Sequence, residues 1–252
     1  MNSLPQTIEE VIAQMDAIIE HSLEANSRLG YFAALYRKVT IQVKKNIDKK
    51  KFANPELMAR LAVTFAGKYL TAYEQYHNGE KPTAPWDIAF GASKRRYPII
   101  LQHLLLGMNA HINLDLAIAS SETSSGTDIL GLKEDFMQIN DLLASQIPIV
   151  LKAINKCSPF IGLISFFYKD TEEKVTHFSL EIARAYSWLL AEDLAVGDTF
   201  LQKKLIDKTI GEVSELANKL LHTKGWVKLL IFIVAIAESN NIRKNIEALK
   251  AT

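Results

Sequence analysis

The sequence predicts an all-α protein, a single-domain bundle of about eight or nine helices. Apolar residues recur at helical spacing along nearly the whole chain, and no strand-like alternation persists. Hydrophobic residues make up 48% and charged residues 23% of the 252 residues, which is the balance of a soluble globular protein with a substantial core. No linker is long enough to force a split. We therefore expect one all-helical domain over residues 1–252, with C-terminal helices at 198–249 packed on the rest.

The N-terminal part is predicted to form three long helices. The first covers residues 5–25, where isoleucine, valine, methionine and leucine share one stripe. The second runs from Tyr31 to about Lys50. Asn54 is a typical N-cap, and Pro55 suits a first helical position because no N–H donor is needed there. A third helix therefore begins at this point and ends near His77, before the turn-rich segment "HNGEKPTAP".

The remaining elements follow from the same periodicity. A short helix is expected at 86–90, and Pro98 opens a longer helix that ends at the polar segment "SSETSSGTD", the best candidate for a mobile loop. Four helices of roughly 20 residues are expected at 133–156, 171–195, 198–222 and 225–249. Between the first two of these, "CSPFIGLISFFYKD" is interpreted as a short apolar segment that caps the bundle.

Charge and cysteine content exclude several classes of protein. Lys and Arg number 29 against 28 Asp and Glu, so the basic excess of a general nucleic-acid binder is missing. The single cysteine excludes an internal disulfide and fits a cytoplasmic location, and no secretory signal is recognised at the N-terminus. The longest apolar run, Leu229–Ala237, is too short to span a membrane, and we expect no peripheral membrane association either. The oligomeric state, including a homodimer, is left open.

The segment "LLLGMNAHINLDLAIA" (104–119) carries the strongest functional signal. It is apolar nearly all round, as in a central helix, yet polar residues interrupt it at every second position: Asn109, His111, Asn113 and Asp115. At 100° per residue, His111 and Asp115 share one stripe, and the two asparagines lie on roughly the opposite side. A buried polar group left unpaired costs roughly 1–3 kcal/mol, so these groups must find partners.

Two interpretations of this motif stay open. In the structural one, the asparagines bond to neighbouring helices and Asp115 orients His111, so that a polar network fixes the packing. In the functional one, the motif lines a pocket for a small polar ligand or a divalent metal, and the protein could be a hydrolase. His111 then acts as general base or metal ligand and Asp115 orients it or shares the metal. Asn109 and Asn113 position the ligand.

A second stripe lies in the predicted helix 171–195. His177, Glu181, Arg184 and Trp188 fall at i, i+4, i+7 and i+11. One interpretation is an exposed face with a Glu–Arg pair of small value. The other is that the stripe faces the motif across a pocket, so that His177 and Glu181 add metal ligands and Arg184 meets an anionic ligand. Such a mixed N/O site suits zinc with several histidines, and manganese or iron with more carboxylates.

The motif resembles the signature of an uncharacterised bacterial family of unknown function, with a G-[M/I]-N-A-H-I-N-x-D-L core. Similar segments here are "YFAALYRKVT", "FANPELMARLAVTFAGKYLTA", "APWDIAF", "DFMQINDLL" and the spacing between Arg184 and Trp188. The resemblance covers about residues 31–194 and implies an all-helical domain without an established activity. It groups the four polar motif residues with Trp86, Asn140 and Asp141 as one constellation, while His177 and Glu181 match no residue of the family pattern.

The sequence therefore leaves two function classes, and it does not decide whether the protein is an enzyme. One is a ligand- or metal-binding protein, with hydrolase activity as its catalytic form and with Trp86, Asn140 and Arg184 as further ligand-binding residues. The other is a non-enzymatic helical scaffold or interaction protein in which the motif only fixes core packing.

Overall fold

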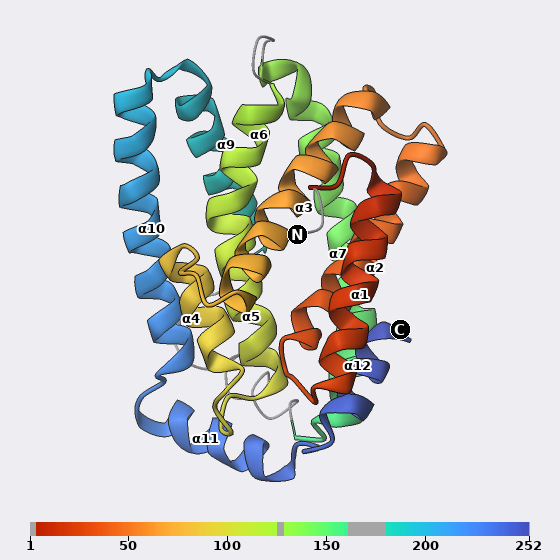
Figure 1. Cartoon of the computed structure of the whole chain (residues 1–252), viewed down its shortest axis with the longest axis vertical. Helices are drawn as coiled ribbons and strands as arrows, with labels where there is room; N and C mark the ends of the chain where they lie inside the picture. Colours follow the sequence, from red (N-terminus) through yellow and green to blue (C-terminus); the bar gives the residue numbers. More distant parts are fainter. Residues whose placement is uncertain (1–3, 125–128, 161–179, 252) are drawn as a thin grey trace.

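A computed structural model describes residues 4–124, 129–160 and 180–251, and every regular element in these ranges is a helix (Figure 1). The α-helices are α1 (Ile8–Glu24), α2 (Gly30–Asp48), α3 (Pro55–His77), α4 (Ala84–Ala92), α5 (Ile100–Ala110), α6 (Leu116–Thr123), α7 (Lys133–Cys157), α9 (Leu180–Val196), α10 (Thr199–Leu221), α11 (Gly225–Ala237) and α12 (Ile242–Lys250). A π-helix, η1 (His111–Asp115), joins α5 to α6, and a 3₁₀-helix, η2 (Ile129–Leu132), precedes α7. The predicted all-helical class is confirmed.

The predicted count of eight or nine helices is wrong, because the described residues form ten when α5, η1 and α6 are taken as one continuous helix. The extra helix comes from the region 225–249, which was expected to be a single helix. There the backbone turns extended at Glu238, and the Asn241 side chain accepts a hydrogen bond from the N–H of Lys244 to start α12. The residues between, "SNN", favour such turns and caps over a helix interior.

Helix starts follow the capping chemistry of the sequence. The Asn54 side chain accepts a hydrogen bond from the N–H of Leu57, with Pro55 in the first turn of α3, as predicted. The Thr7 side chain accepts from Glu10 at the start of α1, and the Asp198 side chain accepts from Leu201 at the start of α10. Each cap satisfies a backbone donor that the helix itself leaves open.

The continuous helix α5–η1–α6 is the centre of the molecule (Figure 1). It contacts α2, α3, α4, α9 and α10, so it is surrounded on most sides. The predicted central position of the motif is therefore observed. The apolar side chains of the core form two clusters, and the central helix contributes to both. One cluster includes Tyr69, Trp86 and Leu104, and the other includes Leu116, Phe136 and Trp188.

Helix α7 is packed mainly at its two ends. Near its start, Phe136 is buried, and both carboxylate oxygens of Asp135 accept hydrogen bonds from the backbone of residues 53 and 54, at 2.7 Å each. Near its end, Ala153, Ile154 and Cys157 are buried. No residue between these two groups is buried. The middle of α7 is therefore less closely packed than its two ends.

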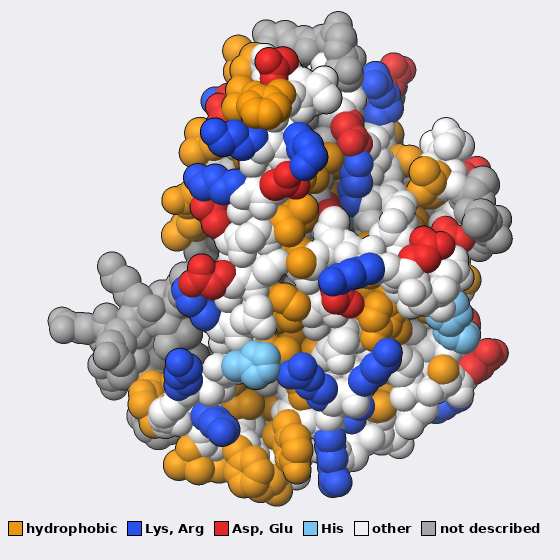
Figure 2. Space-filling view, turned by 60° about the vertical axis from the view of Figure 1, so that its left-hand side comes forward, with side chains coloured by type: hydrophobic (Ala, Val, Ile, Leu, Met, Phe, Trp, Pro, Cys, Tyr) orange, Lys and Arg blue, Asp and Glu red, His pale blue; other side chains and the backbone are white. Residues whose placement is uncertain are grey.

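Helix α11 leaves one apolar face uncovered. Five large apolar side chains on it are exposed: Trp226, Leu229, Phe232, Ile233 and Ile236. Figure 2 shows apolar side chains gathered at the lower end of the molecule, where Figure 1 places this helix. No single helix of the described residues is long and apolar enough to cross a membrane, although α10 and α11, joined by a 65° bend, reach that length and hydropathy together.

Candidate functional site

The π-helix η1 consists of the motif residues His111 to Asp115. In a π turn the backbone bonds i to i+5, and the N–H of Leu116 accordingly donates to the carbonyl of His111. Such turns are rare and occur often at functional sites. Within this turn, Nδ1 of His111 lies 3.0 Å from Oδ2 of Asp115. The indole N–H of Trp86 donates to the same oxygen at 2.9 Å.

Aromatic rings enclose the His111 imidazole. The ring of Phe65 stacks on it with centroids 3.6 Å apart, and the ring of Tyr36 meets it edge-on at 4.5 Å. His111 is 2% exposed, and this burial lowers its pKa below the ordinary 6.5, although the bond to Asp115 acts in the opposite direction. The imidazole is therefore neutral near pH 7.

The two ring nitrogens of His111 have different surroundings. With Nδ1–H donating to Asp115, Nε2 carries a free lone pair. Nε2 is buried and has no hydrogen-bond partner among the described residues. A buried acceptor without a partner is unusual in a folded protein and calls for a ligand or a water molecule.

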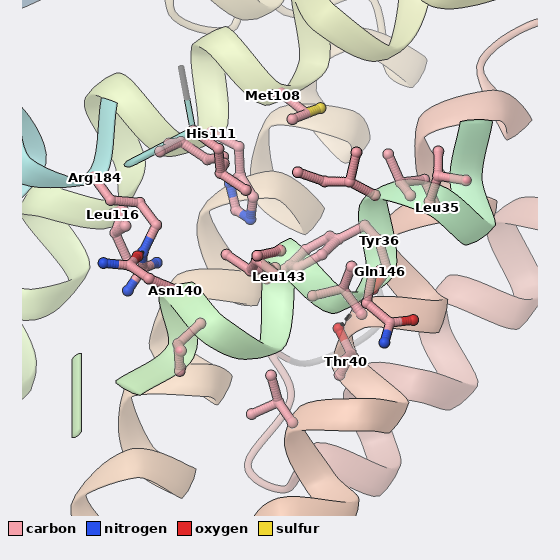
Figure 3. Close-up of a pocket in the computed structure, with 18 of the residues that line it drawn as sticks. Leu35, Tyr36, Thr40, Met108, His111, Leu116, Asn140, Leu143, Gln146 and Arg184 are labelled. Atoms are coloured by element: carbon pink, nitrogen blue, oxygen red, sulfur yellow. Dashed lines mark hydrogen bonds between the residues drawn. The ribbon is translucent and has the colours of Figure 1, made fainter. Parts of the chain in front are cut away.

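His111 lines a cavity of about 850 Å³, which is bounded by α2, α3, the central helix, α7 and α9 (Figure 3). Aliphatic and aromatic side chains make up most of its wall, among them Leu35, Met108, Leu116, Leu143 and Ile147. His111 is one of the few polar residues that line it. The space beneath the middle of α7 is thus a cavity with an imidazole in its wall.

Arg184 occupies another part of this wall. In Figure 3 it lies with Asn140 and Leu116 on one side of His111, while Leu35 and Gln146 lie on the other. Arg184 is 4% exposed, and burial lowers its pKa to about 9, so it stays charged at neutral pH. Its Nε–H donates to the side-chain oxygen of Asn140, and Nη2 donates to the carbonyl of Phe136.

The two asparagines of the motif face away from the cavity. The Asn109 amide donates to the carbonyl of Val213 on α10 at 2.9 Å, and the Asn113 amide donates to the Asn109 oxygen, also at 2.9 Å. Neither asparagine is among the described residues that line the cavity. They connect the central helix to α10.

Gly107 permits a close contact that shapes this region. A Cβ atom at this position would lie 2.4 Å from the ring of Phe32, which is far inside van der Waals contact. The glycine of the motif therefore lets α5 approach α2 at the level of the cavity wall.

The structure brings together part of the predicted constellation. His111, Asn140, Asp141, Glu181 and Arg184 line the cavity. Asp115 and Trp86 stand behind His111 and hold its orientation, and Trp86 is 1% exposed and outside the lining. His177 lies outside the described residues.

The expectation of an exposed Glu–Arg face on the second stripe is wrong. Glu181 is exposed, but Arg184 and Trp188 are buried, and no ion pair joins Glu181 to Arg184. The reason is that α9 packs against α6 and η1, which covers the side of α9 that carries these two residues.

The described part of the chain offers few side chains that could bind a metal ion. No group of three or more His, Cys, Asp and Glu side chains there is placed to hold a metal ion. His111 and Asp115 are engaged with each other. The second predicted pair is incomplete within these ranges, because of its two members only Glu181 is described.

Sequence reasoning missed the aromatic enclosure of His111. Tyr36 and Phe65 lie on helices whose apolar stripes look like ordinary core, and nothing in their spacing separates a cavity wall from a packed interior. The π turn does not follow from the sequence either, because a regular period of 100° per residue does not reveal a local change in the backbone hydrogen bonding.

A model of a protein family described as a family of unknown function (DUF5995) matches residues 8–223. No curated protein and no solved structure matches the chain. The resemblance to a family of unknown function is thereby confirmed. The expected span of about 31–194 was too narrow, since the match includes the whole of α1 and of α10 as well.

Proposed function

The chain belongs to DUF5995, a family of unknown function, and from the geometry of the cavity we propose that it binds an amphipathic small molecule with a long apolar body. The observation that carries this proposal is the cavity of about 850 Å³ beneath α7. Protein interiors are close-packed, with few voids larger than a water molecule. Ligand pockets, in contrast, measure about 300–1,000 Å³.

The cavity wall indicates the character of the ligand. Its aliphatic and aromatic side chains offer a long molecule extensive apolar contact, and water inside would find few polar partners. Polar groups are confined to a few places, such as His111 and the Arg184–Asn140 pair. This wall favours an amphipathic molecule over the small polar ligand expected from the sequence.

A cavity-filling substitution tests this proposal. Nile red, an uncharged apolar dye whose emission changes in apolar surroundings, is titrated into delipidated protein. We expect saturable binding of one dye per chain. Ala144→Trp, which puts a large ring at the cavity wall, should weaken dye binding at least tenfold, whereas Ser145→Trp, at the neighbouring position that is not among the described lining residues, should not. Absence of saturable binding, or equal binding by both variants, would overturn the proposal.

The unpaired Nε2 of His111 favours a second candidate function, hydrolysis of an ester of such a molecule. A neutral imidazole held by Asp115 is suited to take a proton from water in the cavity. Thr40 is the one aliphatic hydroxyl or thiol among the described lining residues, and its hydroxyl already donates to the carbonyl of Tyr36. Water is therefore the nucleophile in this candidate.

Substitution of His111 by Asn tests the hydrolytic candidate. Asn at this position keeps a donor near the Nδ1 position of the imidazole and removes Nε2. With p-nitrophenyl octanoate as substrate, His111→Asn should abolish turnover above background, and activity should fall in wild type as pH falls and His111 becomes protonated. Turnover that persists in His111→Asn, or none in wild type, would remove the candidate.

The scaffold interpretation receives support from one half of the motif. The bonds of Asn109 and Asn113 toward α10 are those of a structural network. We also propose that the chain is one single-domain bundle, because α10 packs on α4 and α5, and α12 packs on α2 and α7. In this proposal the asparagines serve packing and His111 serves the ligand.

A further inference from the structure

We propose that Arg184 binds the carboxylate of a long-chain carboxylic acid whose apolar chain occupies the cavity. The inference rests on the proposed ligand-binding function and names the chemical class of its ligand. Its starting point is a buried cation in the wall of an apolar cavity.

Among the described residues, Arg184 has no carboxylate partner. No Asp or Glu oxygen lies within 4.0 Å of its guanidinium among the described residues, and its two hydrogen-bond acceptors, the Asn140 amide and the Phe136 carbonyl, are neutral. The ring of Phe136 lies 4.3 Å from its Cζ atom. Buried charges in proteins are normally paired, because an uncompensated charge is costly to remove from water. An anion in the cavity would supply the missing partner.

The hydrogen-bond inventory of Arg184 fits one carboxylate. A guanidinium has five N–H donors, and the two bonds described involve Nε and Nη2. No described residue accepts from the two N–H groups of Nη1 or from the second N–H of Nη2, and these donors lie on adjacent nitrogens. This is the fork that binds a planar carboxylate through two parallel hydrogen bonds. A single guanidinium balances the one negative charge of a carboxylate but not the two of a phosphate monoester.

Two carboxylates near this end of the cavity limit the strength of the site. Asp141 and Glu181 also line the cavity, and both residues are exposed. Their charges are therefore screened by water, whereas Arg184 is buried and acts at short range. The net preference for an anion should thus be moderate, and it should grow when the Glu181 charge is removed.

The position of Arg184 also sets the course of the bound chain. In Figure 3, Leu116 and Asn140 lie with Arg184, and Leu143 and His111 lie between this group and the far side with Leu35 and Gln146. A ligand anchored at Arg184 would extend along the underside of α7 and pass the free Nε2 of His111. A hydroxyl group partway along the chain could donate to that nitrogen.

The experiment compares ligands that differ only in their head group. Nile red bound to wild-type protein is displaced by hexadecanoic acid, by its methyl ester, by hexadecanol and by hexadecyl phosphate. We expect the acid to displace the dye at about tenfold lower concentration than the alcohol or the ester, as a charge-assisted pair implies. The phosphate should not surpass the acid. Equal displacement by acid, ester and alcohol would overturn the inference, and a stronger phosphate would replace the carboxylate assignment.

Variants show whether Arg184 causes the preference. Arg184→Gln should remove the advantage of the acid and leave the alcohol unchanged, and Glu181→Gln is the matched variant that should strengthen the acid alone. Loss of acid and alcohol together in a folded Arg184→Gln protein would contradict the inference. If that variant does not fold, the comparison of head groups in wild type still decides. Failure of Nile red to bind wild type refutes the proposed function itself, whereas dye binding without an acid preference refutes only the role of Arg184.

Discussion

The two polar pairs of the motif lie on the same helix and have opposite surroundings. Asn109 is fully buried and bonded to the α10 backbone and to Asn113, so each amide has a protein partner. His111 is buried as deeply, yet one of its two nitrogens has no partner among the described residues. Burial alone therefore does not separate a structural polar residue from a functional one. Satisfaction of its donors and acceptors does.

Removal of the Asn109 side chain should have the largest effect on stability. Asn109→Ala leaves the Val213 carbonyl and the Asn113 amide without their partner, and we expect a loss of about 3 kcal/mol in the free energy of unfolding. Urea denaturation followed by circular dichroism measures it. A loss below about 1 kcal/mol would show that α10 is not held by this bond.

Substitution of Gly107 should have the second-largest effect on stability. In Gly107→Ala the new methyl group meets the ring of Phe32, so that either the ring or α5 must move, at a cost of about 2 to 3 kcal/mol. The same denaturation assay applies. Gly91→Ala is the matched control, because nothing lies within 4 Å of a Cβ atom there and the change should be neutral or stabilising. Equal effects at both positions would contradict the close approach.

A second buried histidine among the described residues, His103, extends the comparison to the dependence of stability on pH. His103 is 6% exposed, and burial lowers its pKa to about 3. As pH falls below 6.5, His103 takes up a proton in the unfolded chain but not in the folded protein. The contribution of His103 to the free energy of unfolding is therefore complete above pH 6.5 and is lost as pH falls toward 3. Between pH 7.5 and pH 5 this histidine accounts for about 2 kcal/mol.

His103→Gln should therefore flatten the fall in melting temperature between these two pH values. The burial of Glu238 raises its pKa to about 7, which acts in the opposite sense, since stability from this group is lost as pH rises. The difference between wild type and His103→Gln, rather than the wild-type curve alone, isolates the histidine. Parallel curves for the two proteins would contradict a neutral His103.

The smallest effect on stability is expected at His111. His111→Asn keeps a donor for Asp115 and removes a nitrogen that has no partner among the described residues, so the change removes mainly the packing of the imidazole against Phe65 and Tyr36, at about 1 kcal/mol. The role of His111 in ligand binding is measured by comparing two acids, 10-hydroxyhexadecanoic acid and hexadecanoic acid, as displacers of bound Nile red. The hydroxyl of the first should donate to Nε2, so His111→Asn should weaken the hydroxy acid relative to hexadecanoic acid. Asn109→Ala should weaken stability and leave the ranking of these ligands intact. A larger loss of stability in His111→Asn than in Asn109→Ala would contradict the assignment of a structural role to Asn109 and a functional one to His111.

The sequence was sufficient for those parts of the molecule that follow local rules. The cap at Asn54, the central position of the motif and the opposite facing of its two pairs all follow from side-chain type and helical period. The break at Glu238 was missed because the apolar pattern continues across the polar turn that interrupts it. The family resemblance named Asn140 and Asp141, and the second stripe contains Glu181 and Arg184; all four line the cavity.

The cavity itself could not be read from the sequence. Phe65 and Leu143 have the same helical spacing as core residues, and whether such a side chain meets a neighbour or an empty space depends on how far apart the helices stand. The contact between Arg184 and Asn140 joins α9 to α7 across 44 positions of sequence. Pairings at that separation are a result of tertiary packing and leave no periodic trace.

The π turn gives the central helix an inserted residue. Every side chain after Asp115 is thereby rotated relative to the direction that an uninterrupted α-helix would give it. Leu116, Ala117 and Ala119, which α6 buries, reach their places only with this shift. Loss of a single residue at 112 would straighten the turn and rotate that whole segment within its packing, so the length of this helix, and not only its composition, is under constraint.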